Sequence, residues 1–230
     1  MKTIADSRGV VLERIRAATR NFAPAERGAA HAGAGAERDY IRRGSMTAEA
    51  RLERMAERLR EYDAEVVECR PEGLAAAIEA QLRASGRRTF VAPEGLPTEW
   101  KAPGFDWKID GDLPMDEIER ADGVVTACFC GVAESGTIVN HHGAMEGRRV
   151  ITLLPDWHLC VLRAGQIVET LPEYFDRCGR QGIGSREQGT ERLPTLVTWI
   201  AGPSATADIE MTRIKGVHGP RFLNVILVRD

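Results

Sequence analysis

The spacing of apolar residues along the chain changes near residue 66. Before that point, in residues 1–20 and again in residues 47–62, apolar positions recur every three or four residues, which is typical of amphipathic helices. Thr47 has a hydroxyl that can cap the second of these helices, and acidic residues follow in its first turns. Beyond residue 66 the apolar residues gather in short runs separated by glycine, proline and charged residues, a pattern that is typical of buried strands.

The second part of the chain alternates predicted strands with predicted helices. The apolar runs predict strands at 66–69, 88–91, 123–129, 150–154, 196–200 and 222–228, a hairpin over 159–168, and helices at 71–86, 115–121 and 172–178. A strand, a helical crossover and a second strand in residues 66–91 favour parallel pairing. The sequence therefore predicts an α/β fold with a mostly parallel sheet. Residues 93–112, rich in proline and tryptophan, are expected to be irregular.

Length and composition fit one α/β domain with an N-terminal appendage. The chain has 230 residues, of which 43% are hydrophobic and 28% are charged, as in ordinary globular proteins. We expect residues 1–44 to form an N-terminal helix followed by an arm rich in Ala, Gly and Arg, and residues 45–230 to form the domain. Residues 23–44 offer little to bury, which predicts a mobile linker or an arm lying across a partner.

Net charge and hydropathy exclude two classes of protein. The formal charge of −3 argues against nucleic acid as the main partner, because phosphate contacts need a basic surface. No apolar run reaches the ~18 residues of a membrane span, and the N-terminus lacks the apolar core of a signal peptide. We therefore expect no membrane span and a cytoplasmic location.

Five cysteines occur in the chain: Cys69, Cys128, Cys130, Cys160 and Cys178. An odd number in a chain too large to need disulfides predicts reduced thiols. Cys128 and Cys130 share one face of a predicted strand end and could hold part of a metal or iron–sulfur site. No C-x-x-C accompanies them, so we favour buried, unreactive thiols and expect no metal site on this chain.

The stretch GVAESGT at residues 131–137 is the first candidate for chemistry. It follows a predicted strand, and its two glycines let the backbone turn sharply and present N–H groups to a small anion. Glu134 is suited to act as a general base or a covalent acceptor. The predicted ligand-binding residues of this turn are Gly131, Ser135, Gly136 and Thr137. An ordinary turn with Glu134 facing water is the alternative.

A second polar region follows the predicted strand at 196–200. Residues 202–210, GPSATADIE, place four polar side chains on one side if the segment is extended, and residues 216–220, GVHGP, set His218 between two glycines. Ligands bind at the carboxyl ends of strands in open α/β sheets, so we expect this region to share one rim with Glu134. Asp208 and His218 are then further catalytic candidates. The predicted ligand-binding residues here are Gly202, Ser204, Thr206, Glu210, Gly216 and Gly219.

Several of these residues also have purely structural explanations. His218 can bond a carbonyl in a tight turn, and Asp208 can cap a helix or accept backbone N–H bonds. The adjacent histidines at 141–142 are poor metal ligands because neighbouring side chains point apart, so we expect exposed loop histidines. His158 is expected to be structural, with a place in the wall of a site as the alternative.

Four segments together resemble the LUD-domain family, in its lactate-utilization protein C (LutC/YkgG) group. They are GVAESGT at 131–137, LLPDWH at 153–158, GPSATADIE at 202–210 and GVHGP at 216–220. The resemblance covers residues 45–230. It implies a three-layer α/β/α fold of the sugar-phosphate isomerase and CoA-transferase (NagB/RpiA/CoA-transferase-like) type. It also implies a role beside an iron–sulfur partner and an oxidoreductase-like partner in the oxidation of L-lactate to pyruvate.

The resemblance does not carry over a catalytic step for this chain. It places the iron–sulfur cluster on a partner subunit and no cofactor on this chain. Three hypotheses follow: a subunit of a lactate-oxidising assembly that binds a small carboxylate or phosphate-type anion, a stand-alone CoA-transferase or isomerase that uses Glu134, or a non-catalytic module that senses a carboxylate. Each is compatible with a homo-oligomer.

Overall fold

The computed structural model describes residues 4–19, 40–180, 194, 196–207, 213–216 and 218–229. The chain divides into two units, residues 1–40 and residues 41–230. In the first unit the structure describes one helix, α1 (Ile4–Thr19), and the side chains described on it, from residue 9 to residue 18, are exposed.

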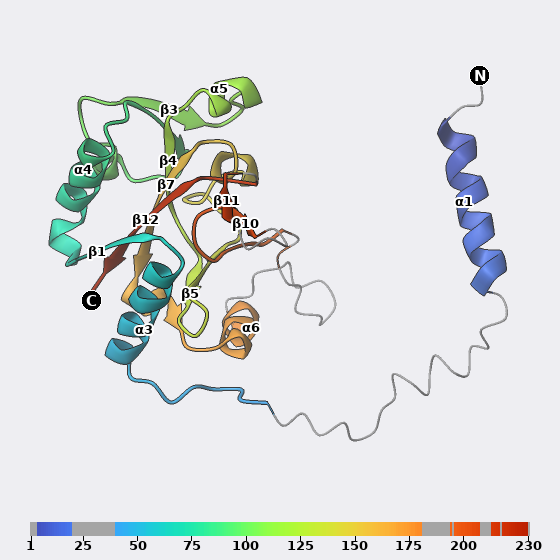
Figure 1. Ribbon diagram of the computed structural model, residues 1–230, viewed down its shortest axis with the longest axis horizontal. Coiled ribbons are helices and arrows are strands. Elements are labelled where there is room, and N and C mark those ends of the chain that lie inside the picture. The colour runs from blue at the N-terminus through green and yellow to red at the C-terminus, as the bar shows by residue number, and fades with distance from the viewer. Residues whose placement is uncertain are drawn as a thin grey trace. The chain divides into compact units, whose positions relative to one another are not determined.

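The second unit is built on a six-stranded, fully parallel sheet (Figure 1). Its strands, in spatial order, are β1 (Glu65–Cys69), β12 (Phe222–Val228), β7 (Trp157–Arg163), β4 (Gly123–Ala127), β2 (Thr89–Pro93) and β3 (Asp106–Asp110). The inner strands are apolar along most of their length because both faces of a parallel sheet are covered. The predicted α/β class with a mostly parallel sheet is thereby confirmed.

Two smaller sheets complete the strand content of the described residues. A four-stranded sheet has the order β8 (Ile167–Val168), β5 (Cys130–Val132), β6 (Thr137–Asn140) and β9 (Thr198–Ile200). An antiparallel pair joins β10 (Ala205–Ala207) to β11 (Arg213–Lys215). In the four-stranded sheet, β6 pairs antiparallel with both β5 and β9, so a segment near residue 138 lies beside one near residue 200.

Three helices, α3 (Ala48–Glu61), α4 (Leu74–Ala84) and α5 (Met115–Glu119), cover the two faces of the parallel sheet, and a fourth, α6 (Leu171–Arg180), packs on the four-stranded sheet. There are 3₁₀ turns at Pro71–Gly73, Thr98–Trp100, Arg149–Thr152 and Ala164–Gln166. Ile78 and Leu82 of α4 pack with Leu159 of β7 on one face. Met55 of α3, with Ile138 of the four-stranded sheet, packs on the other face. The result is three layers, with the smaller sheet in one outer layer beside α3.

Three predicted elements are wrong. The run at 150–154 forms the 3₁₀ turn Arg149–Thr152, because a short buried apolar run does not by itself distinguish a strand from a helical turn. The expected hairpin over 159–168 does not form, because β7 lies in the parallel sheet and β8 in the four-stranded one. The expected irregular segment at 93–112 contains β3, the edge strand beside β2.

The first residues of the second unit are held by two carboxylates. Glu173 accepts a hydrogen bond from the backbone N–H of Gly44 (3.0 Å), and Glu169 accepts one from Met46 (2.6 Å). Thr47 then caps α3 by accepting a bond from the N–H of Ala50 (3.2 Å), as predicted. Residues 41–44 of the expected arm therefore belong to this unit, and residues 20–39 lie outside the described residues.

None of the helices in the described part of the chain combines the length and the apolar character that crossing a membrane requires.

The turn between β5 and β6 packs closely against α3 at Gly136. Gly136 has φ +65°, and a Cβ there would lie 2.6 Å from Cβ of Arg58 on α3. Gly104 has φ +87°, and a Cβ there would meet nothing within 4 Å. Backbone strain of about 1–2 kcal/mol applies to both positions, whereas overpacking of a further ~1–3 kcal/mol applies to Gly136 alone.

We therefore expect Gly136→Ala to lower the free energy of unfolding clearly more than Gly104→Ala does, measured by urea titration of the two variants. Equal losses would show that the turn does not press on α3 in solution.

Candidate functional site

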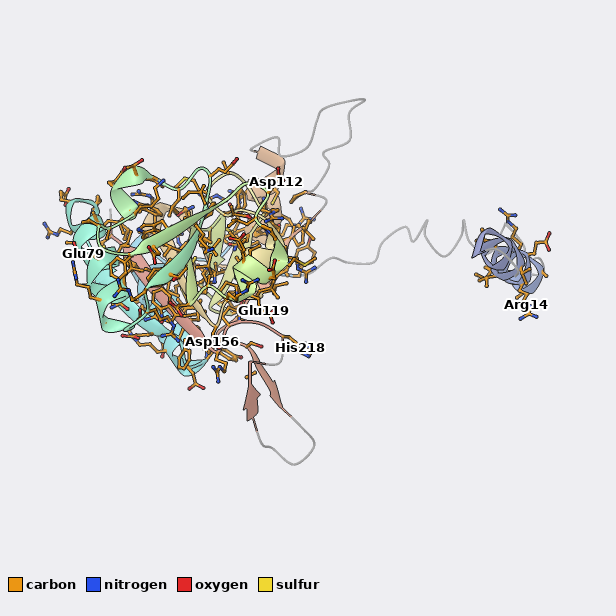
Figure 2. The ribbon with its side chains drawn as sticks, turned by 90° about the horizontal axis from the view of Figure 1, so that it is seen from above. Arg14, Glu79, Asp112, Glu119, Asp156 and His218 are labelled. Carbon is orange, nitrogen blue, oxygen red and sulfur yellow. The ribbon has the colours of Figure 1, made fainter. Side chains whose placement is uncertain are left out.

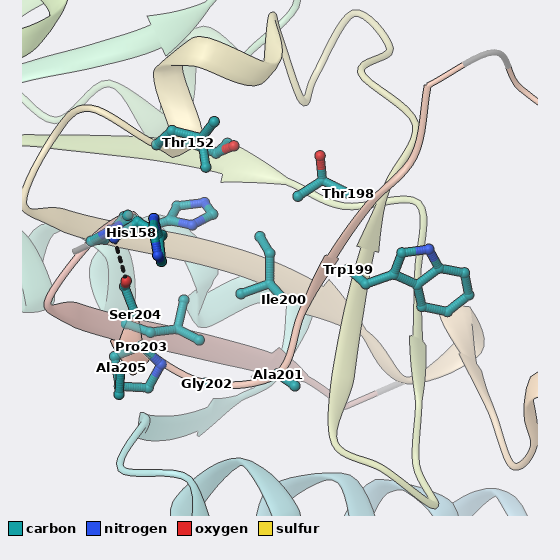
Figure 3. Close-up of a pocket in the computed structure, with 15 residues that line it drawn as sticks. Thr152, His158, Thr198, Trp199, Ile200, Ala201, Gly202, Pro203, Ser204 and Ala205 are labelled. Atoms are coloured by element: carbon teal, nitrogen blue, oxygen red, sulfur yellow. Dashed lines mark hydrogen bonds between the residues drawn. The ribbon is translucent and has the colours of Figure 1, made fainter. Parts of the chain in front are cut away.

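A cavity of about 260 Å³ lies between the parallel sheet and β9. It is lined by residues 152–153, His158, residues 198–205, residues 218–220 and Leu223 (Figure 3). His158 and Leu223 are each the second residue of their strand, so the cavity lies at the amino-terminal ends of β7 and β12. Ligands were expected at the carboxyl ends of the strands, so this cavity lies at the opposite edge of the sheet from the one predicted.

The carboxyl ends of β2 and β4 are covered by a loop of the chain itself. The N–H of Gly95 donates to the carbonyl of Ala144 (3.0 Å), and the N–H of Ala127 donates to the carbonyl of Met145 (3.0 Å). In this fold class the crevice beside diverging strands is the usual ligand site. Residues 141–147 close it here, and space remains at the opposite end of the sheet.

His158 forms part of the cavity wall from within the parallel sheet. The residue is 1% exposed, and its Nε2 lies 2.8 Å from the hydroxyl of Thr126 on β4. Burial lowers the pKa of His158 to about 4, so its imidazole is neutral at pH 7. The alternative reading, a histidine in the wall of a site, is the one the structure supports.

A second histidine touches the cavity through Thr198. Nε2 of His142 lies 2.8 Å from the Thr198 hydroxyl, and Nδ1 lies 3.2 Å from the carbonyl of Gly147. Burial lowers the pKa of His142. A carbonyl oxygen can only accept, so the proton of the neutral ring is on Nδ1 and Nε2 accepts from the Thr198 hydroxyl.

The loop that carries His142 is organised by a buried carboxylate. Glu146 is 8% exposed and accepts hydrogen bonds from the N–H groups of His141 and His142. Burial raises the pKa of Glu146, and these backbone bonds oppose the rise. His141 stacks on Phe129 with ring centroids 3.7 Å apart, and its Nε2 lies 2.9 Å from the Tyr174 hydroxyl. The two histidines are half-buried, so the expectation of exposed loop histidines is wrong.

Ser204 ties together the two polar segments at the mouth of the cavity. Its hydroxyl accepts a bond from the N–H of His218 (3.1 Å), and its own N–H donates to the carbonyl of Pro220 (2.8 Å). The His218 side chain is exposed and projects from the surface of the domain (Figure 2). Gly202 has φ +95°, and a Cβ there would lie 2.7 Å from Cβ of Tyr62, so the start of this segment requires glycine.

Asn140 adds an unusual polar group behind the cavity. It lies directly opposite Thr198 in the pairing of β6 with β9, and paired residues point to the same face of a sheet. The residue is 0% exposed, and both amide atoms lack a hydrogen-bond partner among the described residues.

Some of the predicted site residues meet at this cavity and others do not. Gly202, Ser204, His218 and Gly219 line it. Gly216 is exposed, and its N–H donates to the carbonyl of Ser204 (2.9 Å). Asp208 and Glu210 lie outside the described residues, as does the side chain of Thr206.

The other predicted group, residues 131–137, does not line the cavity. The side chain of Glu134 is exposed, and its N–H donates to the carbonyl of Glu169 (3.0 Å). The remaining members pack locally: Gly131 lies against Met55 and Leu162, Gly136 lies against Arg58, and the hydroxyls of Ser135 and Thr137 are 2.8 Å apart. The expected convergence of Glu134 on a shared cavity is wrong, because its turn rests on α3 and leaves the acid facing outward.

Sequence reasoning missed Thr152 and Thr198 entirely. Thr152 donates its hydroxyl proton to the carbonyl of Arg149 (3.0 Å), and Thr198 donates to His142. Both look like ordinary members of apolar segments, and no local pattern marks them. In the sequence, the feature that indicates this cavity is His158, a histidine near the start of an otherwise apolar run.

The predicted burial of the cysteines is confirmed at four of the five positions. All five are free, and every one except Cys69 is buried. Burial is the main cause that raises the pKa of Cys130 to about 12, so that thiol is protonated at pH 7. Among the described residues, no cluster of three histidine, cysteine or acidic side chains has the arrangement of a metal site.

The chain is similar to the LUD domain and to proteins named lactate utilization protein C. The family model of the LUD domain matches residues 44–228. Lactate utilization protein C of Deinococcus radiodurans is 38% identical over 178 residues, which cover 77% of this chain and 79% of that protein. Lactate utilization protein C of Bacillus subtilis is 33% identical over 139 residues, which cover 59% of this chain and only 55% of that protein.

Among solved structures, a DUF162 family protein from Deinococcus radiodurans has a similar fold. The two structures superpose with a TM-score of 0.64 at 31% sequence identity, over 80% of this chain and 99% of that chain.

The buried His158 predicts a pH dependence of stability. The pKa of His158 is about 4 in the folded protein and about 6.5 in an unfolded chain. Its contribution is therefore fully present above pH 6.5 and is lost as the pH falls towards 4, by about 3 kcal/mol in total. We expect His158→Gln, which cannot titrate, to flatten the fall in unfolding free energy over this range. Parallel pH curves for the two proteins would contradict the assignment.

The unpaired amide of Asn140 predicts a stabilising substitution. Replacing a buried polar group that lacks a partner with an apolar group of similar shape removes a desolvation cost of about 1–3 kcal/mol. We expect Asn140→Leu to raise the free energy of unfolding, measured by urea titration. A clear loss of stability would show that the amide is hydrogen-bonded in solution.

Proposed function

This chain belongs to the LUD domain family, and from that premise we propose that it serves in lactate utilization by binding a small carboxylate in the cavity beside His158. Relatives named lactate utilization protein C support the process. The volume of about 260 Å³ is several times the ~30 Å³ share of one water molecule, which leaves room for a small acid.

One observation carries the proposal. Three of the four segments that resemble the family meet at this cavity. Leu153 and His158 come from the segment at 153–158, Gly202 and Ser204 from the segment at 202–210, and His218 and Gly219 from the segment at 216–220. A ligand that binds in this cavity would contact all three segments, although they are separate in the sequence. Among its groups, the Ser204 hydroxyl can donate to a carboxylate.

We propose that the chain works as one subunit beside an iron–sulfur partner and an oxidoreductase-like partner, which together oxidise L-lactate to pyruvate. The family resemblance supports this arrangement. The role of this chain is then to hold the acid, with the electrons passing to the partners. The alternative of a transferase that uses Glu134 has less support, because that side chain is exposed and lies outside the cavity.

Growth of the organism that carries this gene tests the proposal. We expect deletion of the gene to slow growth on L-lactate and to spare growth on glucose. Complementation with the wild type or with Glu134→Gln should restore growth on lactate. Ser204→Ala should restore it poorly, because one lost hydrogen bond to a charged ligand costs about 1.5–3 kcal/mol of binding.

Two results would contradict the proposal. Equal growth of the deletion strain on both carbon sources would remove the link to lactate. Full complementation by Ser204→Ala together with failure of Glu134→Gln would move the chemistry to the turn at 131–137.

A further inference from the structure

We infer that His142, which does not itself line the cavity, acts through Thr198 to make the cavity select a ligand hydroxyl over a ligand carbonyl. The cavity would thus prefer a 2-hydroxy acid to the 2-oxo acid formed by its oxidation. This inference rests on the proposed function, because it takes the small-carboxylate site as its starting point.

The first step is the direction of the bond between His142 and Thr198. The carbonyl of Gly147 lies 3.2 Å from Nδ1 and can only accept, so the ring proton is on Nδ1. Nε2 then has a lone pair and no proton, and it accepts from the Thr198 hydroxyl across 2.8 Å. With its proton donated to His142, Thr198 can offer the cavity only oxygen lone pairs.

Thr152 also offers the cavity only oxygen lone pairs, because its hydroxyl proton is donated to a backbone carbonyl. Its hydroxyl donates to the carbonyl of Arg149 across 3.0 Å. The carbonyl cannot reverse the bond, so Thr152 also faces the cavity as an acceptor. Figure 3 shows Thr152 and Thr198 along one side of the cavity. That side therefore calls for a ligand group that carries a proton to donate.

Ser204 has the opposite polarity. Its hydroxyl oxygen accepts a bond from the N–H of His218 (3.1 Å), which leaves its own proton free to donate. Figure 3 places Ser204 across the cavity from Thr152 and Thr198. The cavity thus has acceptors on one side and a donor on the other, and the polarity of each is set by a backbone group or by His142.

A 2-hydroxy acid matches both sides. Its hydroxyl can donate to the threonine oxygens, and its carboxylate can accept from Ser204. A 2-oxo acid has only acceptors, so its carbonyl oxygen would face threonine lone pairs. Thr198 could turn its proton towards that carbonyl only by leaving Nε2 of the half-buried His142 without its donor, and the loss of that hydrogen bond is a cost. We expect a preference of about tenfold or more for the hydroxy acid, since about 1.4 kcal/mol corresponds to a factor of ten.

Calorimetric titration of the full chain at pH 7.5 tests this inference. The probes are L-lactate and glycolate, their oxidation products pyruvate and glyoxylate, and inorganic phosphate. We expect the wild type to bind each hydroxy acid at least about tenfold more tightly than its oxo acid. Thr198→Ser should keep the preference, and Thr198→Val should lose it. Thr170→Val is the matched control, because its buried hydroxyl has no partner among the described residues and lies outside the cavity.

The variant His142→Phe distinguishes two roles of His142: orienting the Thr198 hydroxyl, and only stabilising the loop. Thr198 keeps its hydroxyl in this variant but loses its acceptor, so the acids should still bind and the ratio of their affinities should fall towards one. A purely structural role would weaken both acids alike and leave the ratio unchanged. Thr198→Val or His142→Phe could fail to fold, which a thermal melt would reveal. In that case Thr152→Val should lower the same ratio of affinities.

The outcomes distinguish this inference from the proposed function. Equal binding of hydroxy and oxo acids, a preference for the oxo acids, or an unchanged ratio in His142→Phe would overturn the inference and leave the carboxylate site standing. Binding of none of the carboxylates, or of phosphate alone, would overturn the proposed site itself and the inference with it.

Discussion

The site depends on one buried carboxylate, that of Glu146. A buried charge is costly unless hydrogen bonds satisfy it, and here the N–H groups of His141 and His142 are brought to it. Meeting that requirement folds residues 141–147 into a tight loop in which His142 adopts φ +60°, an uncommon conformation for a residue other than glycine. His142 then reaches the Gly147 carbonyl and Thr198. The conformation of the loop and the polarity of the cavity therefore have a common cause.

The same loop explains where the cavity lies. By bonding to Gly95 after β2 and to Ala127 at the end of β4, it covers the edge of the sheet at which parallel α/β folds usually bind ligands. The cavity described above lies at the opposite end of β7 and β12, under β9 and residues 201–205. The four-stranded sheet supplies that cover, since the pairing of β6 with β9 brings residues near 200 over the parallel sheet.

The sequence predicted the parts of the fold that depend on local patterns. The helix at Leu74–Ala84 and the strand at Phe222–Val228 have strong apolar periodicity, and both were placed closely. The site was predicted only in part. Ser204 and His218 lie in distinctive polar segments, but the facing of Glu134 depends on a turn packing against α3, and Thr198 gains its role from a histidine far away in the chain. Neither relation is visible in local spacing, because the first arises from a turn packing against a helix and the second from pairing between short strands of three or four residues.

These contacts divide the site into two parts. The segments that resemble the family supply part of the cavity wall, including the donor Ser204. The loop at 141–147, which is not one of the four segments that resemble the family, supplies the neutral imidazole that accepts a hydrogen bond from Thr198. Because a hydroxyl can either donate or accept along a given direction, its partner decides which chemical form of a ligand it recognises. If the cavity holds the small acid that we propose, another residue at position 142 would leave that acid bound but remove the preference for its reduced form over its oxidised form.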